Sequence, residues 1–327
     1  MEKGNRMKYF KQPAGFVAFA VVLYMALIGA NGPRYIGAQT PRSLQEPDAH
    51  RLRVVMLGTG TPAPDPERSG PAVAVVAGNS SYLVDCGAGV VRRSVAAAMR
   101  YSIRPLFAVN LKVLFVTHLH SDHTVGYPDL ILTPAVAGRS GPLEVYGPPG
   151  IKAMTDHILE AYKEDISLRV HGMEHEDPAQ YVVNVHEIQP GVIYKDANVT
   201  VTAFAVHHGE WKHAFGYKFE TPDRTAVISG DTSPTQTVVD NCNGCDLLVH
   251  EVYCQEGFKA LPAPRKEYFT QYHTSGVELG KLASEAHPNQ LVLYHQVLWN
   301  CPETELLAEI GGLYKGKVTP AHDLDMY

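Results

Sequence analysis

The stretch His118-Leu119-His120-Ser121-Asp122-His123 decides the fold and most of the chemistry of this chain. Four metal-binding side chains fall within six residues, directly after the apolar run 113–116. Imidazole and carboxylate groups suit Zn²⁺ or a similar divalent ion. His118 and His120 are two residues apart and can point to one side of an extended loop, whereas Asp122 and His123 follow the turn. We therefore expect one short loop to begin two adjacent metal positions, and not a surface loop that is rich in His and Asp by chance.

The composition is that of a globular chain with room for a large core. The chain has 327 residues, of which 45% are hydrophobic and 19% are charged, as in ordinary globular domains. Its formal net charge of -6 and its pI near 6.2 argue against a general nucleic-acid binder, which usually carries a basic face. We therefore do not expect a nucleic acid as its substrate.

Residues 1–38 have the pattern of a signal peptide or an N-terminal anchor. Basic residues at positions 3–11 precede the uncharged apolar run 15–30, which is short for a transmembrane span. This pattern predicts an exported protein, periplasmic or secreted, that stays attached to the membrane if the segment is not cleaved. A polar linker is expected at 39–50, and the functional domain at 51–327.

The five cysteines leave their pairing open. Cys242 and Cys245 form a lone C-x-x-C, and the second pair that a zinc ribbon needs is absent from the sequence. A local disulfide and two unpaired thiols are both compatible with this spacing. In an exported protein some of the five could be oxidised, and the odd number leaves at least one thiol free or intermolecular.

Apolar runs that end at a His or an Asp recur along the chain. Strands are predicted at 53–57, 72–76, 81–84, 112–116, 143–146, 199–206, 225–229, 246–249 and 290–294, and helices at 90–99, 151–162 and 275–286. In layered α/β folds, ligands bind at the C-terminal ends of strands. We therefore expect one face of the domain to carry His118, His120, Asp122, His123, His208, Asp231, His250 and His295.

The order of these motifs resembles the metallo-β-lactamase superfamily, over about residues 50–327. Within the superfamily the chain is most similar to the ribonuclease Z and arylsulfatase/phosphodiesterase branch. The supporting segments are 57–72 (LGTGTPAPDPERSGPA), 82–89 (YLVDCGAG), 118–130 (HLHSDHTVGYPDL), 207–219 (HHGEWKHAFGYKF), 229–232 (SGDT), 247–253 (LLVHEVY) and 273–283 (HTSGVELGKLA). The resemblance implies an α/β fold, the αββα metallo-β-lactamase sandwich of two mixed β-sheets flanked by helices.

The resemblance also implies two Zn²⁺ ions, with Mn²⁺ or Fe²⁺ as an alternative in one site. The first ion is expected on His118, His120 and His208, the second on Asp122, His123 and His295, with Asp231 as the bridge between them. His208 is preferred to His207 because family members place the ligand directly before a glycine. Asp85 is expected to be a structural residue beneath the site.

A hydrolase is the activity that this resemblance implies, with a water activated between the two ions. Asp122 is expected to orient or deprotonate that water, His273 to protonate the leaving oxygen, and Glu251 to fix the tautomer of His273. His250 and Glu251 could equally support a ligand from outside the metal shell. Trp211 and His213 are expected either to line the substrate pocket or to lie on the surface.

The segment between AFGY and SGDT favours a small ester. Ribonuclease Z members of the branch insert a long arm here, whereas only residues 220–228 separate Phe219 from Ser229. The prediction is a di-zinc hydrolase of a small phosphodiester or aryl sulfate. A ribonuclease Z-type tRNA 3′-processing endoribonuclease is the alternative, and a non-catalytic metal-binding protein is the alternative of another class. The expected partner is a small-molecule ester, and a second copy of the chain in a homodimer is a further candidate.

Overall fold

Two mixed β-sheets form the centre of the fold in a computed structural model, which describes residues 52–327. The first sheet has the order β1 (Arg53–Gly58), β2 (Ala72–Ala77), β3 (Ser80–Val84), β4 (Val113–Phe115), β5 (Leu143–Gly147) and β6 (Val183–Glu187). The second has the order β13 (Lys317–Pro320), β12 (Gln290–Val297), β11 (Leu247–Tyr253), β10 (Thr225–Ile228), β9 (Phe215–Glu220), β8 (Thr200–Ala205) and β7 (Gly191–Lys195).

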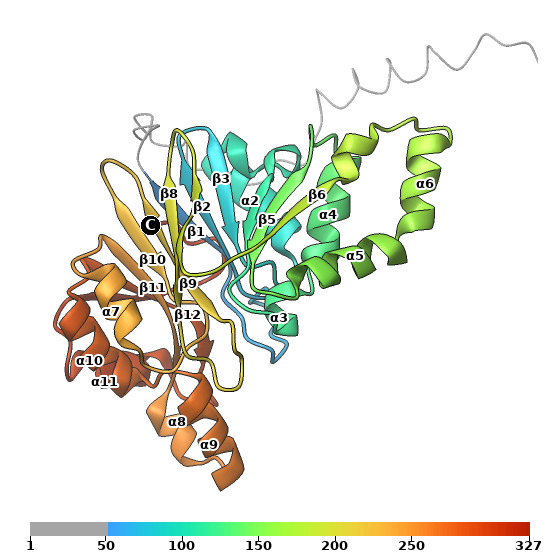
Figure 1. Cartoon of the computed structure of the whole chain (residues 1–327). Helices are drawn as coiled ribbons and strands as arrows, with labels where there is room; N and C mark the ends of the chain where they lie inside the picture. The colour runs from blue at the N-terminus through green and yellow to red at the C-terminus, as the bar shows by residue number, and fades with distance from the viewer. Residues whose placement is uncertain (1–51) are drawn as a thin grey trace, which may run out of the picture. The chain divides into compact units, whose positions relative to one another are not determined.

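The helices lie outside the two sheets and at their ends. They are α2 (Val90–Tyr101), α3 (Ser121–Thr124), α4 (Tyr127–Val136), α5 (Ile151–Ala161), α6 (Lys163–His171), α7 (Gln236–Cys242), α8 (Gln255–Lys259), α9 (Ala263–Tyr272), α10 (Gly276–Ala286) and α11 (Glu303–Gly311). Helices α2, α4 and α5 pack on the first sheet, and α7, α10 and α11 pack on the second (Figure 1). The predicted αββα sandwich is therefore confirmed.

Each sheet combines antiparallel and parallel pairing. Strands β1 to β3 are antiparallel, whereas β3 to β6 are parallel. In the second sheet β7 to β10 are antiparallel, whereas β10 to β13 are parallel. Parallel strands end at the same edge of a sheet, so the loops after β4, β10, β11 and β12 can meet there.

The hydrophobic core is divided by the two sheets into three clusters. Apolar side chains of both sheets meet between them, and two further clusters lie under the outer helices. Strand β2 is buried along its whole length because both of its faces are covered. Such strands appear in the sequence as continuous apolar runs, as in AVAVVA at 72–77, where the predicted strand 72–76 ends one residue earlier.

The described part of the chain contains two disulfides and one buried thiol. Cys242 bonds Cys245, Cys254 bonds Cys301, and Cys86 is free and buried. The local disulfide was one of the two alternatives open for the C-x-x-C. The link between Cys254 and Cys301, which are 47 residues apart, could not be inferred from spacing.

Residues 1–51 are outside the described part of the chain, and with them the predicted export signal (1–38) and the whole predicted linker (39–50). Between residues 52 and 327, no helix is both long enough and apolar enough to cross a bilayer.

Candidate metal centre

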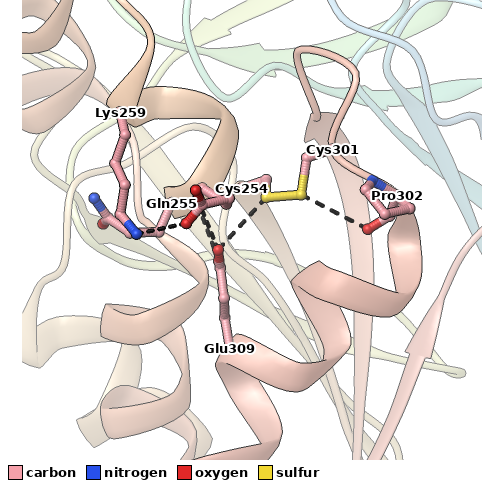
Figure 2. Close-up of a disulfide and its surroundings, with 7 residues drawn as sticks. Cys254, Gln255, Lys259, Cys301, Pro302 and Glu309 are labelled. Carbon is pink, nitrogen blue, oxygen red and sulfur yellow. Dashed lines mark hydrogen bonds and ion pairs between the residues drawn. A yellow bond between two sulfur atoms is a disulfide. The ribbon is translucent and has the colours of Figure 1, made fainter.

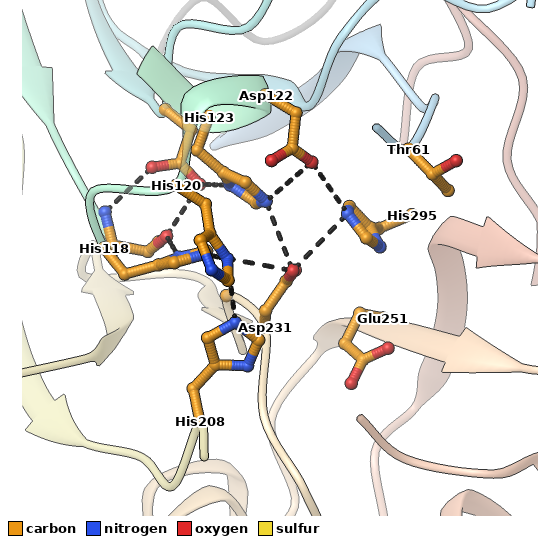
Figure 3. A network of polar contacts seen from close by, with 12 residues as sticks. Thr61, His118, His120, Asp122, His123, His208, Asp231, Glu251 and His295 are labelled. Atoms are coloured by element: carbon orange, nitrogen blue, oxygen red, sulfur yellow. Dashed lines mark hydrogen bonds and ion pairs between the residues drawn. The ribbon is translucent and has the colours of Figure 1, made fainter. Parts of the chain in front are cut away.

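The seven predicted ligands converge at the edge where the two sheets meet (Figure 3). The loop after β4 and the single turn α3 supply four of them. His208 and Asp231 come from the loops after β8 and β10, and His295 lies within the C-terminal half of β12. They form two neighbouring groups. The first contains His118, His120, His208 and Asp231, and the second contains Asp122, His123 and His295. Within each group the candidate ligand atoms lie within 4.8 Å of one another.

The first group is a triangle of imidazole nitrogens. Nδ1 of His120 lies 3.0 Å from Nε2 of His118 and 3.1 Å from Nε2 of His208. His118 and His208 are fully buried. Three nitrogens that meet at this distance need a proton or a cation between them, because their lone pairs would otherwise repel.

The second group contains a carboxylate and two imidazoles. Oδ2 of Asp122 lies 3.3 Å from Nε2 of His295 and 3.6 Å from Nε2 of His123. Asp231 lies between the groups: its Oδ2 is 3.3 Å from His123, 3.4 Å from His295 and 4.0 Å from His118. A single carboxylate is thus within reach of both positions, as a bridging ligand must be.

Neighbouring acceptors select the imidazole tautomers that suit a metal. Nδ1 of His118 lies 3.0 Å from Thr117 Oγ1, whose own proton goes to Asp85. Nδ1 of His123 lies 2.8 Å from Asp85 Oδ2. In the neutral rings these Nδ1 atoms donate outward, and each Nε2 then has a lone pair directed to the centre. Nε2 of His123 is buried and has no hydrogen-bond partner, and neither has Oδ1 of Asp231. This donor set fits a pair of divalent ions.

Asp85 connects the metal loop to the first sheet. It adopts a left-handed backbone conformation (φ 61°) directly after β3. Its carboxylate accepts from the amide and the hydroxyl of Thr117 at 2.8 and 2.9 Å, and also contacts His123. The next turn needs glycine, because a Cβ on Gly87 would lie 2.6 Å from the carbonyl oxygen of Asp122. Asp85 thus lies beneath the centre and outside the ligand groups.

His208, and not His207, faces the centre. Nδ1 of His208 donates to the carbonyl of Tyr272 at 2.7 Å, and this leaves Nε2 for the centre. His207 is directed to Ser233 Oγ, 2.9 Å away. Gly209 allows this close approach, because a Cβ there would lie 2.0 Å from the Tyr272 ring.

A β-bulge directs His295 into the site. The pairing of β11 with β12 shifts between Glu251 and Val252, so that His295 is the extra residue of β12. Its φ of 46° is unusual for a residue with a Cβ. His250 and Glu251 lie inside β11 and not beyond its end, which differs from the predicted strand 246–249. His250 belongs to none of the ligand groups.

Glu251 and His273 form a buried pair beside Asp231. Oε1 of Glu251 accepts from the Thr274 amide at 2.9 Å, and Oε2 lies 3.3 Å from Nδ1 of His273. His273 also lies within 4.8 Å of Asp231 and His295 by their ligand atoms. The segment is fixed because Ser275 caps α10 in a capping box with Glu278.

Burial and neighbouring charges set the protonation of these groups. Burial lowers the pKa of His208 to about 3 and that of His273 to about 4. Burial also opposes charge on His123, but Asp231 and Asp85 outweigh it and raise the pKa of His123 well above its usual range. Burial raises the pKa of Glu251 well above its usual range. Both shifts in the Glu251–His273 pair favour the uncharged forms.

Trp211 contacts a predicted ligand directly, which the sequence did not indicate. Its indole Nε1 donates to Nε2 of His120 at 2.8 Å. With His213 it lines a surface hollow of about 290 Å³ beside Leu119. A second hollow of about 510 Å³ borders Asp122 and the turn 61–66. The centre is therefore accessible from the surface at Asp122.

This fold and this His/Asp centre define a class, the metal-dependent hydrolases with two sheets in an αββα sandwich. Residues 81–296 match the family described as a beta-lactamase superfamily domain. A ribonuclease Z of Mycobacterium bovis is 32% identical over 279 residues, which cover 84% of this chain and 96% of the relative. A ribonuclease Z of Mycobacterium marinum is 33% identical over 250 residues, covering 75% and 86%. The chain belongs to the metallo-β-lactamase superfamily, and its relatives there are named ribonuclease Z.

Solved structures agree with the fold. The short form of human tRNase Z superposes with a TM-score of 0.60 at 24% identity, covering 84% of this chain and 98% of that one. The metallo-β-lactamase fold protein YhfI of Bacillus subtilis superposes with a TM-score of 0.63 at 19% identity, covering 84% and 98%.

One expectation was wrong. The acidic net charge led us not to expect a nucleic acid as a substrate, yet the relatives that cover most of the chain are ribonucleases by name. The net charge is a sum over the whole chain, whereas a nuclease needs favourable charge only at the site that binds the nucleic acid. Bound metal ions also add positive charge there, and the net charge of the sequence does not include them.

Proposed function

We propose that this chain is a metal-dependent endoribonuclease of the ribonuclease Z type, which cleaves a phosphodiester bond in RNA. The observation that carries the proposal is the complete ligand set of the two groups, from both sheets, in a chain whose relatives are named ribonuclease Z. A non-catalytic scaffold has no need of a full set. Two divalent ions supply, when bound, an activated water and positive charge against the developing charge of the phosphate.

The residues of the chain have distinct roles in this proposal. His118, His120 and His208 would hold one ion, and Asp122, His123 and His295 would hold the other, with Asp231 within reach of both groups. Asp122 is the most exposed carboxylate of the centre and orients the attacking water. In the uncharged pair, His273 donates the proton on its Nε2 to the leaving oxygen. The neutral Glu251 carboxyl group, 3.3 Å from Nδ1, positions the ring and replaces that proton at Nδ1.

The test is a comparison of substrates with the zinc-loaded full chain. A precursor tRNA with a 3′ trailer should be cut once, and bis(p-nitrophenyl) phosphate should be hydrolysed faster than p-nitrophenyl sulfate. His273→Ala should keep its zinc but lose most of its kcat, whereas His171→Ala, an exposed histidine of α6, should match the wild type. An intact precursor tRNA in the presence of stoichiometric zinc would contradict the proposal.

A specific observation supports a second candidate, the hydrolysis of a small phosphodiester. Strands β9 and β10 are joined by the short turn 221–224, and Thr221 closes the turn through Arg224. This leaves no arm at that point of the described chain to bind the body of a tRNA. Cleavage of bis(p-nitrophenyl) phosphate without cleavage of precursor tRNA would favour this candidate, as would export by residues 1–38, measured by fractionation of expressing cells.

A further inference from the structure

An aromatic cavity lies directly beside the candidate metal centre. It has a volume of about 270 Å³, enough for a planar ring system and small compared with typical ligand pockets. His273 and His295 form part of its wall, so the cavity opens onto the centre. Its principal lining residues are Arg265, Tyr268, Phe269, His273, His295 and Trp299.

The aromatic rings of this cavity divide into a support and a contact surface. Phe269 is 6% exposed, and its ring packs edge-on against Trp299 with centroids 4.5 Å apart. Tyr268 is 36% exposed, although its ring stacks on Tyr272 with centroids at 4.2 Å. Tyr268 and Trp299 therefore present ring surface, while Phe269 holds them from behind. Uncovered aromatic rings at a catalytic centre favour a planar, aromatic ligand.

Arg265 adds an unpaired positive charge to the cavity. Its guanidinium lies over the Phe269 ring, 5.4 Å from the centroid. Among residues 52–327, no carboxylate forms an ion pair with Arg265. Arginine is well suited to phosphate because its planar group donates two parallel hydrogen bonds. The cavity thus combines aromatic surface with an anion-binding group.

A disulfide holds the two walls of the cavity together. Figure 2 shows the disulfide between Cys254 and Cys301. Cys254 directly precedes the hairpin α8–α9, which carries Arg265 and Tyr268, and Cys301 lies two residues after Trp299. Glu309 of α11 fixes the start of the hairpin, because its carboxylate accepts from the amides of residues 255 and 256 at 2.9 and 2.8 Å. The walls are therefore placed before any ligand enters, which lowers the entropic cost of binding.

We propose that this cavity binds the nucleobase next to the scissile phosphate, stacked on Tyr268 and Trp299, while Arg265 binds a neighbouring phosphate. The inference rests on the proposed function and extends it to a base-binding subsite. Because His273 lies in the cavity wall, the bound base belongs to the nucleotide whose oxygen accepts the proton on leaving.

The first test measures binding without turnover. AMP and ribose 5-phosphate differ only in the base, so we compare their Kd for the zinc-loaded chain by calorimetry. The wild type should bind AMP roughly ten-fold more tightly, as expected for one base stacked on aromatic side chains. In Tyr268→Ala and in Trp299→Leu this preference should fall below about three-fold, whereas Arg265→Gln should weaken both ligands. Equal binding of the two ligands by the wild type overturns the proposal.

Matched controls separate stacking from loss of structure. Tyr162→Ala removes an aromatic ring that is 42% exposed but lies outside the cavity lining, and should retain the wild-type preference for AMP. Tyr268→Phe keeps the ring and should do the same. If Tyr268→Phe loses the preference as fully as Tyr268→Ala, stacking is not its cause and the proposal is overturned.

Cleavage assays distinguish this inference from the proposed function. If the wild type prefers AMP through Tyr268 and Trp299 but cuts no precursor tRNA, the subsite stands and the proposed function falls. If precursor tRNA is cut and its kcat/KM is unchanged in both variants, the function stands and the subsite is overturned. If both are correct, kcat/KM falls in the variants, and replacing the base at the cleavage nucleotide by an abasic ribose removes the difference between variants and wild type.

Discussion

The position of the proton on the His120 ring determines whether this residue can be a metal ligand. Trp211 can only donate, so its contact at 2.8 Å makes Nε2 of His120 an acceptor and places the proton of that ring on Nδ1. That proton points at Nε2 of both His118 and His208, where a cation would otherwise lie. The indole thus competes with metal for the tautomer of His120.

Replacement of the indole should therefore strengthen metal binding. Trp211→Phe removes the donor, so that His120 can carry its proton on Nε2 and offer Nδ1 as a ligand. We expect zinc affinity to rise by roughly five-fold, which corresponds to about 1 kcal/mol for the one hydrogen bond that no longer competes. Competition with a chromophoric chelator measures this, and Lys212→Ala, at an exposed neighbouring position, is the control. Weaker zinc binding in Trp211→Phe would mean that the indole supports the ligand instead.

We expect Asp231 to determine how many ions the centre binds, because its carboxylate lies within reach of both candidate groups. Burial opposes its charge, yet His295 and His123 outweigh burial and hold its pKa well below the usual range, so it is a carboxylate at neutral pH. Asp231→Asn keeps the shape and removes the charge that both groups share. Metal analysis should give about two equivalents for the wild type and one or fewer for the variant, with activity lost in parallel. The control is Asp129→Asn, which changes a partly exposed carboxylate of α4 and should retain two metal equivalents per chain. If Asp231→Asn also retains two equivalents, Asp231 does not bridge the ions.

At the scale of elements, the sequence predicted several of those whose burial leaves a pattern, although β9 and α4 are also largely buried and were not predicted. Strands such as β2 are apolar throughout, and α10 has a capping box and an apolar face, so both were found. Helix α9 was missed because only Phe269 of its ten residues is buried, which gives no helical period to detect. The residues that converge at the candidate centre could be predicted from motif order. The bulge at His295 and the contact of Trp211 with His120 could not, because they depend on pairing between distant segments.

The hairpin α8–α9 should depend on its disulfide more than on its own core. Closing a loop of 47 residues restricts the unfolded chain by about 4 kcal/mol in the chain-entropy model. We expect Cys254→Ser with Cys301→Ser to lower the free energy of unfolding by about 2–4 kcal/mol in urea. Because the hairpin carries one wall of the aromatic cavity, KM should rise more than kcat falls. The control is Cys242→Ser with Cys245→Ser, which opens only a local loop. An equal loss of unfolding free energy in this control would argue against a special role for the Cys254–Cys301 disulfide.

At the scale of the whole molecule, the two sheets are joined by polar contacts as well as by their shared core. The Tyr82 hydroxyl of the first sheet donates to Asp196 at 2.5 Å, and the Tyr194 hydroxyl of the second donates to the same oxygen at 3.0 Å. Oδ1 of Asp196 accepts from the amides of Asn198 and Val199. One carboxylate thus fixes the distance between the sheets at the end remote from the metal loop.

The contribution of Asp196 should appear as a dependence of stability on pH. Burial raises its pKa, but the hydrogen bonds from Tyr82 and from the amides outweigh burial, so the net shift is downward from 3.8. A carboxyl group whose pKa is lower in the folded state stabilises the fold above its unfolded pKa, and this stability is lost as the pH falls through the folded value.

Asp196→Asn should therefore cost about 1 kcal/mol at pH 7, a modest value because the group is partly exposed. The difference from the wild type should narrow at pH 3, where urea unfolding can be compared with Asp156→Asn, an exposed carboxylate that should change stability by only a few tenths of a kcal/mol. A gap that is the same at both pH values would show that the carboxylate charge does not join the sheets, and that packing alone does.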